Sequence, residues 1–172
     1  MHSNSQQRFN LVAKILHWSC STLILFNLVL GISLDITHLK FLHIQIGLLI
    51  LLLVCIRIFW RLTSTYPDKI HTVPKWEIIL AQILQFALYL LMILIPVSGI
   101  LMVQAKGHVV NIFNLIDITT IIHPQQKIIA HQYKEIHEFL AYLLLGLVGI
   151  HVLGAFKNHF IYKNQVLKRM FF

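Results

Sequence analysis

The chain has 172 residues, of which 58% are hydrophobic and 12% are charged, and its formal net charge is +8. A mean hydropathy of +0.77 lies far outside the range of soluble globular domains and predicts an integral membrane protein. The basic residues are not gathered into one stripe interleaved with aromatic residues, so we expect no nucleic-acid partner.

Four apolar segments approach the roughly 20 residues that a helix needs to cross the hydrocarbon core of a bilayer. In chain order they cover residues 11–34, 41–62, 76–103 and 128–156. The first segment ends without a small-x-small cleavage site, so we interpret it as a retained span and not as a secretory signal. The expected fold class is all-α, with residues 1–172 forming a single membrane domain built as a four-helix bundle.

The distribution of basic residues predicts the orientation of these spans. If both termini are cytoplasmic, the outer side keeps Lys40, Lys106, Lys127 and Lys134. The cytoplasmic side then holds ten basic residues, namely Arg8, Lys14, Arg57, Arg61, Lys69, Lys75, Lys157, Lys163, Lys168 and Arg169. The loop of residues 104–127 would face outward, and its mixture of apolar and polar positions predicts a short helix or cap against the membrane surface.

Apart from His131, which lies at a helix end, four of the 11 histidines fall inside the predicted spans. His137 and His151 are separated by about 21 Å along one helix and lie within about 40° of the same face. His17 begins a span that leaves the cytoplasm and His151 ends a span that returns to it, so both belong to the inner leaflet. By the same argument His43 and His137 belong to the outer leaflet. The sequence therefore predicts two histidine pairs at two depths.

Paired imidazoles in hydrocarbon indicate a ligand function, although a single buried histidine is more often a core residue or a proton relay. Zinc needs three or four protein ligands, and copper sites usually include a thiolate or thioether. A haem supplies four nitrogens to its iron and needs only two axial ligands. The pattern therefore favours two b-type haems, each bound by two histidines. Such an iron has no open position for oxygen chemistry, so electron transfer is the expected function.

Other residues are candidates for holding these haems. Arg57 follows His43 by the same spacing that separates His137 from His151, so we expect it beside the inner haem, where a guanidinium would bind the carboxylates. Arg61 is suited either to this role or to lipid headgroups. The small residues Gly47, Ala141, Gly146, Gly149 and Gly154 would allow a flat macrocycle or a neighbouring helix to approach. Trp18, Trp60 and Trp76 are candidates for quinone contacts or for interfacial anchors.

Several motifs together resemble the bacterial cytochrome b561 family of small four-helix dihaem membrane proteins. They are the HW of His17–Trp18, FLHIQIG around His43, YLLMILIPVSG in the third span, KEIHEFLA around His137 and IHVLGAF around His151. The resemblance covers nearly the whole chain and implies a bacterial inner-membrane location, haem ligation at the four histidines and exchange of electrons with ubiquinone. Superoxide oxidases in that family imply superoxide as the outer donor. The chain departs from the family pattern at Gln82, Gln85 and Asn158, and these departures leave the four-histidine scheme intact.

Two further readings remain open from the sequence. One is a haem-bearing anchor subunit that receives electrons from a protein partner such as a hydrogenase or dehydrogenase. The other is a haem-free membrane protein whose histidines relay protons or bind metal ions. The outward loops carry four basic and four acidic groups, so net charge alone gives superoxide no attraction. No catalytic residue is assigned from the sequence.

Overall fold

The computed structural model describes residues 9–64, 73–113, 115–118 and 127–171. Its four long helices are α1 (Leu11–Ile32), α3 (Lys40–Thr63), α4 (Lys75–Ala105) and α5 (Lys127–Phe160). All four are long and apolar enough to cross a membrane. The expected all-α membrane architecture is thus present as four apolar helices. α5 continues to Phe160, beyond the predicted end at residue 156, and backbone N–H groups of the following turn bond the carbonyls of Lys157 and Asn158 in its last turn.

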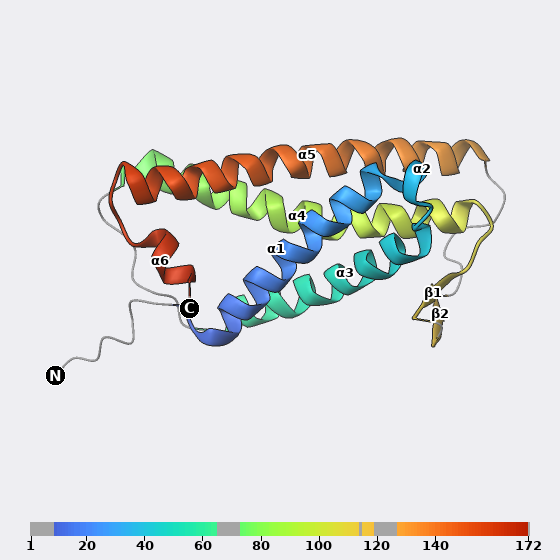
Figure 1. Cartoon of the computed structure of the whole chain (residues 1–172), viewed down its shortest axis with the longest axis horizontal. Helices are drawn as coiled ribbons and strands as arrows, with labels where there is room; N and C mark the ends of the chain where they lie inside the picture. The colour runs from blue at the N-terminus through green and yellow to red at the C-terminus, as the bar shows by residue number, and fades with distance from the viewer. Residues whose placement is uncertain (1–8, 65–72, 114, 119–126, 172) are drawn as a thin grey trace.

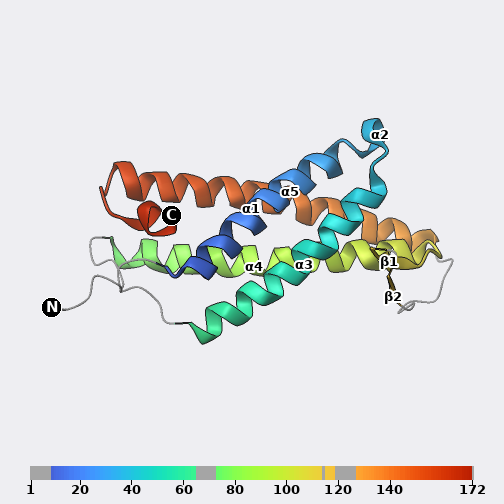
Figure 2. The ribbon, with the colours of Figure 1, turned by 60° about the horizontal axis from the view of Figure 1, so that its bottom comes forward.

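The long helices run alternately up and down and form two close pairs. α5 packs along α4, α1 packs along α3, and α3 also contacts α4 (Figures 1 and 2). α1 and α4 begin, and α3 and α5 end, at one extremity of the bundle, here named the terminal end. The opposite extremity is named the hairpin end. The short helix α2 (Leu34–Thr37) turns the chain from α1 into α3 at the hairpin end.

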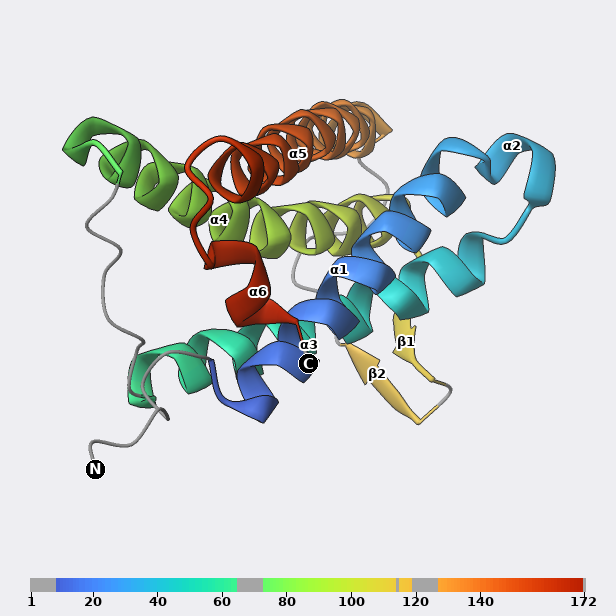
Figure 3. The ribbon, with the colours of Figure 1, turned by 60° about the vertical axis from the view of Figure 1, so that its left-hand side comes forward.

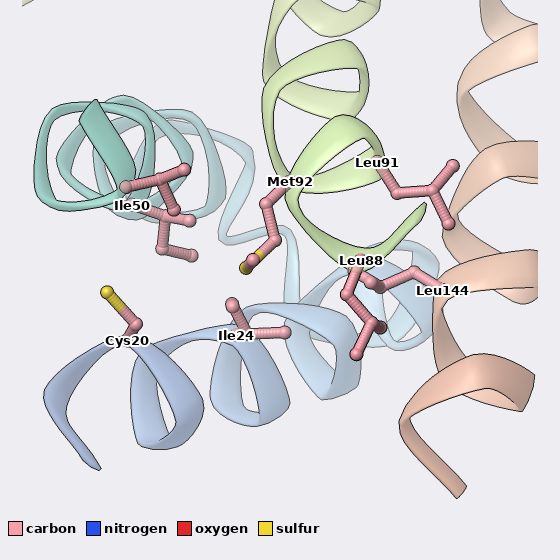
Figure 4. Close-up of a cluster of buried hydrophobic side chains, with 8 residues drawn as sticks. Cys20, Ile24, Ile50, Leu88, Leu91, Met92 and Leu144 are labelled. Atoms are coloured by element: carbon pink, nitrogen blue, oxygen red, sulfur yellow. The ribbon is translucent and has the colours of Figure 1, made fainter. Parts of the chain in front are cut away.

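An apolar cluster fills the middle of the bundle between its two ends. Figure 4 shows side chains from all four long helices converging there, namely Cys20 and Ile24 of α1, Ile50 of α3, Leu88, Leu91 and Met92 of α4, and Leu144 of α5. Leu144 lies seven residues from both His137 and His151, about 10 Å along the helix from each. The cluster therefore separates the two histidine levels with a layer from which water is excluded.

The outward loop contains a β-hairpin where a short helix or cap was expected. Strands β1 (Val110–Ile112) and β2 (Ile116–Ile118) pair antiparallel, with Asn111 opposite Asp117. The predicted short helix is therefore wrong. The alternation of apolar and polar residues over these strands has the period of a strand, and Gln45 of α3 fixes the hairpin by bonding Asn111 O and Phe113 N, both at 2.8 Å. Residues 119–126 of this loop lie outside the described residues.

The basic side chains divide between the two ends as the topology argument assumed. Lys40, Lys106, Lys127 and Lys134 belong to the hairpin end, and the other described lysines and arginines to the terminal end. Arg8 and Lys69 lie outside the described residues. The assignment of the terminal end to the cytoplasm remains a prediction from the positive-inside rule.

The terminal end is tied together by a polar contact between α4 and α5. Glu77 accepts hydrogen bonds from Lys157 Nζ at 2.9 Å and from the Tyr162 hydroxyl at 2.6 Å. Lys157 also lies over the ring of Trp76. After this contact the chain turns back, and the short helix α6 (Val166–Met170) reaches the start of α1 (Figure 3).

Candidate functional site

The four histidines inside the long helices meet in two pairs. At the terminal end, the ring centroids of His17 on α1 and His151 on α5 are 6.5 Å apart, with an angle of 64° between the ring planes. At the hairpin end, the centroids of His43 on α3 and His137 on α5 are 6.1 Å apart, with an angle of 80°. We name these the terminal pair and the hairpin pair. Their partners are those that the depth argument predicts.

The separation of the rings fits one metal ion between each pair. An imidazole nitrogen binds a transition metal at about 2 Å, and the ring centroid lies about 1.2 Å behind that nitrogen, so two rings on opposite sides of one ion have centroids about 6.4 Å apart. The observed separations of 6.5 and 6.1 Å bracket this value. Among the described residues, no three His, Cys, Asp or Glu side chains gather as ligands for a metal ion. Two imidazoles per site match the axial requirement of a haem.

Hydrogen bonds around the hairpin pair fix the tautomer of His137. Nδ1 of His137 lies 2.9 Å from the carbonyl oxygen of Ile95 and 3.1 Å from Oγ of Ser98. The Ser98 hydroxyl donates its own hydrogen to Ile95 O at 2.7 Å, so Nδ1 must carry the proton and donate it. The lone pair of Nε2 is then available for a metal, which is the usual arrangement of a ligating histidine.

Two glycines give the rings of the hairpin pair their space. A Cβ added at Gly31 of α1 would lie 3.1 Å from Cε1 of His43, and one added at Gly99 of α4 would lie 3.2 Å from Cε1 of His137. Either contact is closer than a methyl carbon and a ring carbon tolerate. The buried Nδ1 of His43 faces the backbone of Asn27 without a hydrogen bond of normal geometry. The rings of His43 and His137 are thus packed against the backbone of neighbouring helices at Gly31 and Gly99.

The glycines proposed from the sequence lie in different surroundings. A Cβ at Gly47 would meet Nδ2 of Asn27 at 3.6 Å, an ordinary contact with the neighbouring helix α1. A Cβ at Gly146, Gly149 or Gly154 would meet no atom within 4 Å. Helix packing therefore accounts for the contact at Gly47 but not for the three glycines of α5, each of which faces open space.

Arg57 lies directly against the terminal pair. Its Nη2 is 2.7 Å from Nδ1 of His17, and its Cζ is 5.4 Å from the ring centroid of Tyr89. Because a guanidinium only donates hydrogen bonds, Nδ1 of His17 accepts here and Nε2 carries the proton. Binding of a metal at Nε2 requires the opposite tautomer, so the guanidinium must then turn to another acceptor. A carboxylate beside the site would be a stronger one.

A cavity of about 240 Å³ adjoins Arg57 at the terminal end. Arg61, Trp60, Gln82 and Gln85 line it together with Tyr89. Arg61 donates to Oε1 of Gln85 at 2.9 Å and lies over the same Tyr89 ring. Gln82 and Gln85 thus line a cavity that also contains two guanidinium groups, and their amides offer both donors and acceptors.

The three tryptophans have separate positions. Trp60 lines the cavity and donates to Oδ1 of Asn10 at 3.1 Å. Trp18 follows His17, and their ring centroids are 5.5 Å apart. Trp76 is 62% exposed at the start of α4, next to Lys157, as expected for an interfacial anchor.

Local ion pairs reduce the charge at the hairpin end. Lys134 lies 3.4 Å from Glu138, and His131 lies 3.2 Å from Glu135, both one helical turn apart on α5. The remaining lysines of this end lie at the start of α3, directly after α4 and at the start of α5. Attraction of a small anion therefore receives no support from this charge pattern.

Sequence reasoning did not identify Gly31, Gly99, Ser98 or Tyr89 as part of the sites. Ser98 and Gly99 belong to the motif YLLMILIPVSG of the third span, but the sequence does not indicate that they contact His137. Gly31 carries no sequence signal of its own, and Tyr89 begins the same motif, but nothing in the sequence indicates its contact with Arg57. Their role depends on which faces of four helices meet.

The chain is similar to known proteins over most of its length. The family model of prokaryotic cytochrome b561 matches residues 8–172. Cytochrome b561 homolog 2 of Escherichia coli (strain K12) is 28% identical over 176 residues, which cover 98% of this chain and 93% of that protein. The probable superoxide oxidase CybB of Yersinia pestis is 29% identical over 133 residues, covering 76% and 73%. Cytochrome b561 homolog 1 of Escherichia coli (strain K12) is 24% identical, covering 74% and 72%.

The family match spans nearly the whole chain and confirms the resemblance seen in the sequence motifs. Membership implies binding of b-type haem and a role in membrane electron transfer. Together with the four apolar helices, it identifies a multi-pass bacterial membrane protein. The chain belongs to the prokaryotic cytochrome b561 family.

Proposed function

We propose that the chain is a dihaem cytochrome of the bacterial inner membrane that carries electrons from superoxide at the outer face to ubiquinone, with both termini cytoplasmic. The observation that carries this proposal is the arrangement of four intramembrane histidines as two pairs, with ring centroids 6.5 and 6.1 Å apart, at opposite ends of one bundle. In this proposal His43 and His137 hold the outer haem, and His17 and His151 hold the inner haem.

A haem bound by two imidazoles exchanges single electrons and offers no open coordination position for oxygen. The residues of the chain determine how each haem is held. The Ile95 carbonyl and Ser98 orient His137 for ligation. Arg57 would give up its hydrogen bond to Nδ1 of His17 and donate to a haem carboxylate instead. His17 could then carry its proton on Nδ1 and bind the iron through Nε2. The apolar cluster around Leu144 keeps water from the space between the two haems.

The net reaction needs two equivalents of the donor. Two superoxide anions each lose one electron and become dioxygen, and ubiquinone gains both electrons and two protons to become ubiquinol. The cavity beside Arg57 supports the terminal end as the place of quinone contact, because Trp60 offers an aromatic wall and Gln82 and Gln85 offer hydrogen bonds. The name of the relative from Yersinia pestis favours superoxide as donor, whereas the charge pattern of the hairpin end does not contribute.

The test is a spectroscopic reconstitution of the purified protein. An enzymatic source of superoxide should reduce the b-type haems, a soluble ubiquinone analogue should reoxidise them, and superoxide dismutase should abolish the reduction. A His43→Ala variant is the matched control, since loss of the outer haem should slow reduction by superoxide. A haem spectrum that superoxide leaves unchanged, while ubiquinol reduces it, would contradict superoxide as the donor and point to a protein donor.

A further inference from the structure

We infer that residues 166–171 act as a clasp that positions His17, and that Lys14 and Trp18 are the positioning residues that hold it. This inference rests on the proposed function, because its consequence concerns the haem at the terminal pair. It assigns a role to the C-terminal segment and to two side chains of α1 that do not themselves bind the metal.

The segment returns to the start of α1 through a defined turn. Lys163 has φ of 49°, and the side chain of Asn164 donates to Oδ1 of Asn158 at 2.7 Å, which ties the turn to the end of α5. α6 then lies across the terminal end between α5 and α1 (Figure 3). The route is therefore fixed by contacts of its own before the segment reaches α1.

Two consecutive backbone carbonyls of the segment are held by two side chains of α1. Nε1 of Trp18 donates to Met170 O at 2.9 Å, and Nζ of Lys14 donates to Phe171 O at 2.7 Å. Lys14 and Trp18 are one helical turn apart and so present their donors on the same face. Lys14 is only 6% exposed, and an ammonium group in that position depends on its acceptor.

The clasp is connected to His17 through two other side chains, Trp18 and Arg57. The indole of Trp18 contacts the ring of Phe171, with centroids 5.3 Å apart, and the ring of His17, with centroids 5.5 Å apart. Met170 lines the cavity that also contains Arg57, whose guanidinium bonds Nδ1 of His17. A displacement of the segment would therefore alter both the packing beside the imidazole and the surroundings of its hydrogen-bond partner.

The orientation and the hydration of an axial ligand set the properties of a haem. Groups behind a ligating histidine tune its basicity, and exposure to solvent changes the reduction potential. Loss of the clasp should thus change the inner haem, at the terminal pair. The outer haem, at the hairpin pair, should stay unchanged and serve as an internal reference. This selectivity distinguishes a positioning role from general destabilisation.

The experiment compares Trp18→Phe, Lys14→Met and a deletion of residues 165–172 with the unmodified protein, with Lys75→Met as the control for loss of a lysine at the same end. Redox titration and electron paramagnetic resonance should show a shift of one low-spin haem signal and of its midpoint potential in Trp18→Phe, and a larger shift in the deletion. Lys75→Met should show neither. Both haem signals unchanged in the deletion variant would overturn the inference, as would equal shifts of both haems in Trp18→Phe.

A second measurement does not depend on haem. Trypsin cleavage after Lys168 and Arg169, followed by mass spectrometry, should be several-fold faster in Lys14→Met and Trp18→Phe than in the unmodified protein and in Lys75→Met. Accelerated cleavage in a protein without haem would show that the proposed function fails while the clasp exists. Two bound haems with unchanged cleavage and unchanged spectra would show that the clasp is wrong while the proposed function stands.

Discussion

Replacement of Gly31 by alanine tests how the hairpin pair is seated. The added Cβ would lie 3.1 Å from Cε1 and 3.6 Å from Nδ1 of His43. The imidazole would have to recede by about 0.3 Å to restore an ordinary carbon–carbon contact. Turning a side chain away from its rotamer well costs about 0.5–1.5 kcal/mol. If this strain is present only in the ligated geometry, it lowers the affinity for the outer haem by up to about tenfold.

The assay is haem retention during dilution, measured by absorbance, together with the paramagnetic resonance signal of each haem. Gly99→Ala should have the same effect through His137, since its Cβ would lie 3.2 Å from Cε1. Gly154→Ala is the control for the outer haem, because its Cβ meets no atom within 4 Å and it lies at the opposite end of α5. Normal retention and an unchanged outer-haem signal in the Gly31→Ala, Gly99→Ala double variant would refute the reasoning.

Three further predictions concern the terminal end and the pairing of ligands. His151→Ala should remove one haem and leave the other substantially bound, and His43→Ala should remove the other; loss of both haems from either variant, in a protein that remains folded, would contradict independent pairs. Arg57→Ala should shift the potential of the inner haem alone, because it removes the positive partner of a haem carboxylate, and an unaltered redox titration would count against that role. The Glu77 carboxylate that accepts the Tyr162 hydroxyl raises the pKa of Tyr162 above its ordinary value of 10.0. Because this pKa is raised on folding, the contact stabilises the folded protein below pH 10 and is lost as pH rises through the raised value. The difference between the ultraviolet titrations of the protein and of Tyr162→Phe should show the raised pKa of Tyr162. Glu77→Gln should lower that pKa again. An ordinary tyrosine pKa in the unmodified protein would contradict the contact.

The sequence contains the information for the spans and the histidine depths because both depend on distance along a helix. Hydropathy marks where each helix can lie in hydrocarbon, and the spacing of His137 and His151 sets two levels whatever the packing of the bundle. The position of Arg57 near the terminal pair follows from the same arithmetic. Its contact with Nδ1 of His17 required the structure, because it depends on the distance between α1 and α3.

The features that sequence analysis missed depend on contacts between distant segments. Gly31 and His43 are on different helices, and only their crossing gives the glycine its role. The mixed apolar and polar positions after α4 are compatible with either a surface helix or a hairpin, and the anchor Gln45 that fixes the hairpin is far away in the chain. The return of Met170 to Trp18 likewise leaves no periodic pattern.

The most direct test of the central claim is the haem content of the freshly purified protein, measured as the pyridine haemochrome per polypeptide. Two imidazole pairs with the observed ring separations should bind two b-type haems per chain, both low-spin. A stoichiometry of one or none in the folded protein would contradict the account.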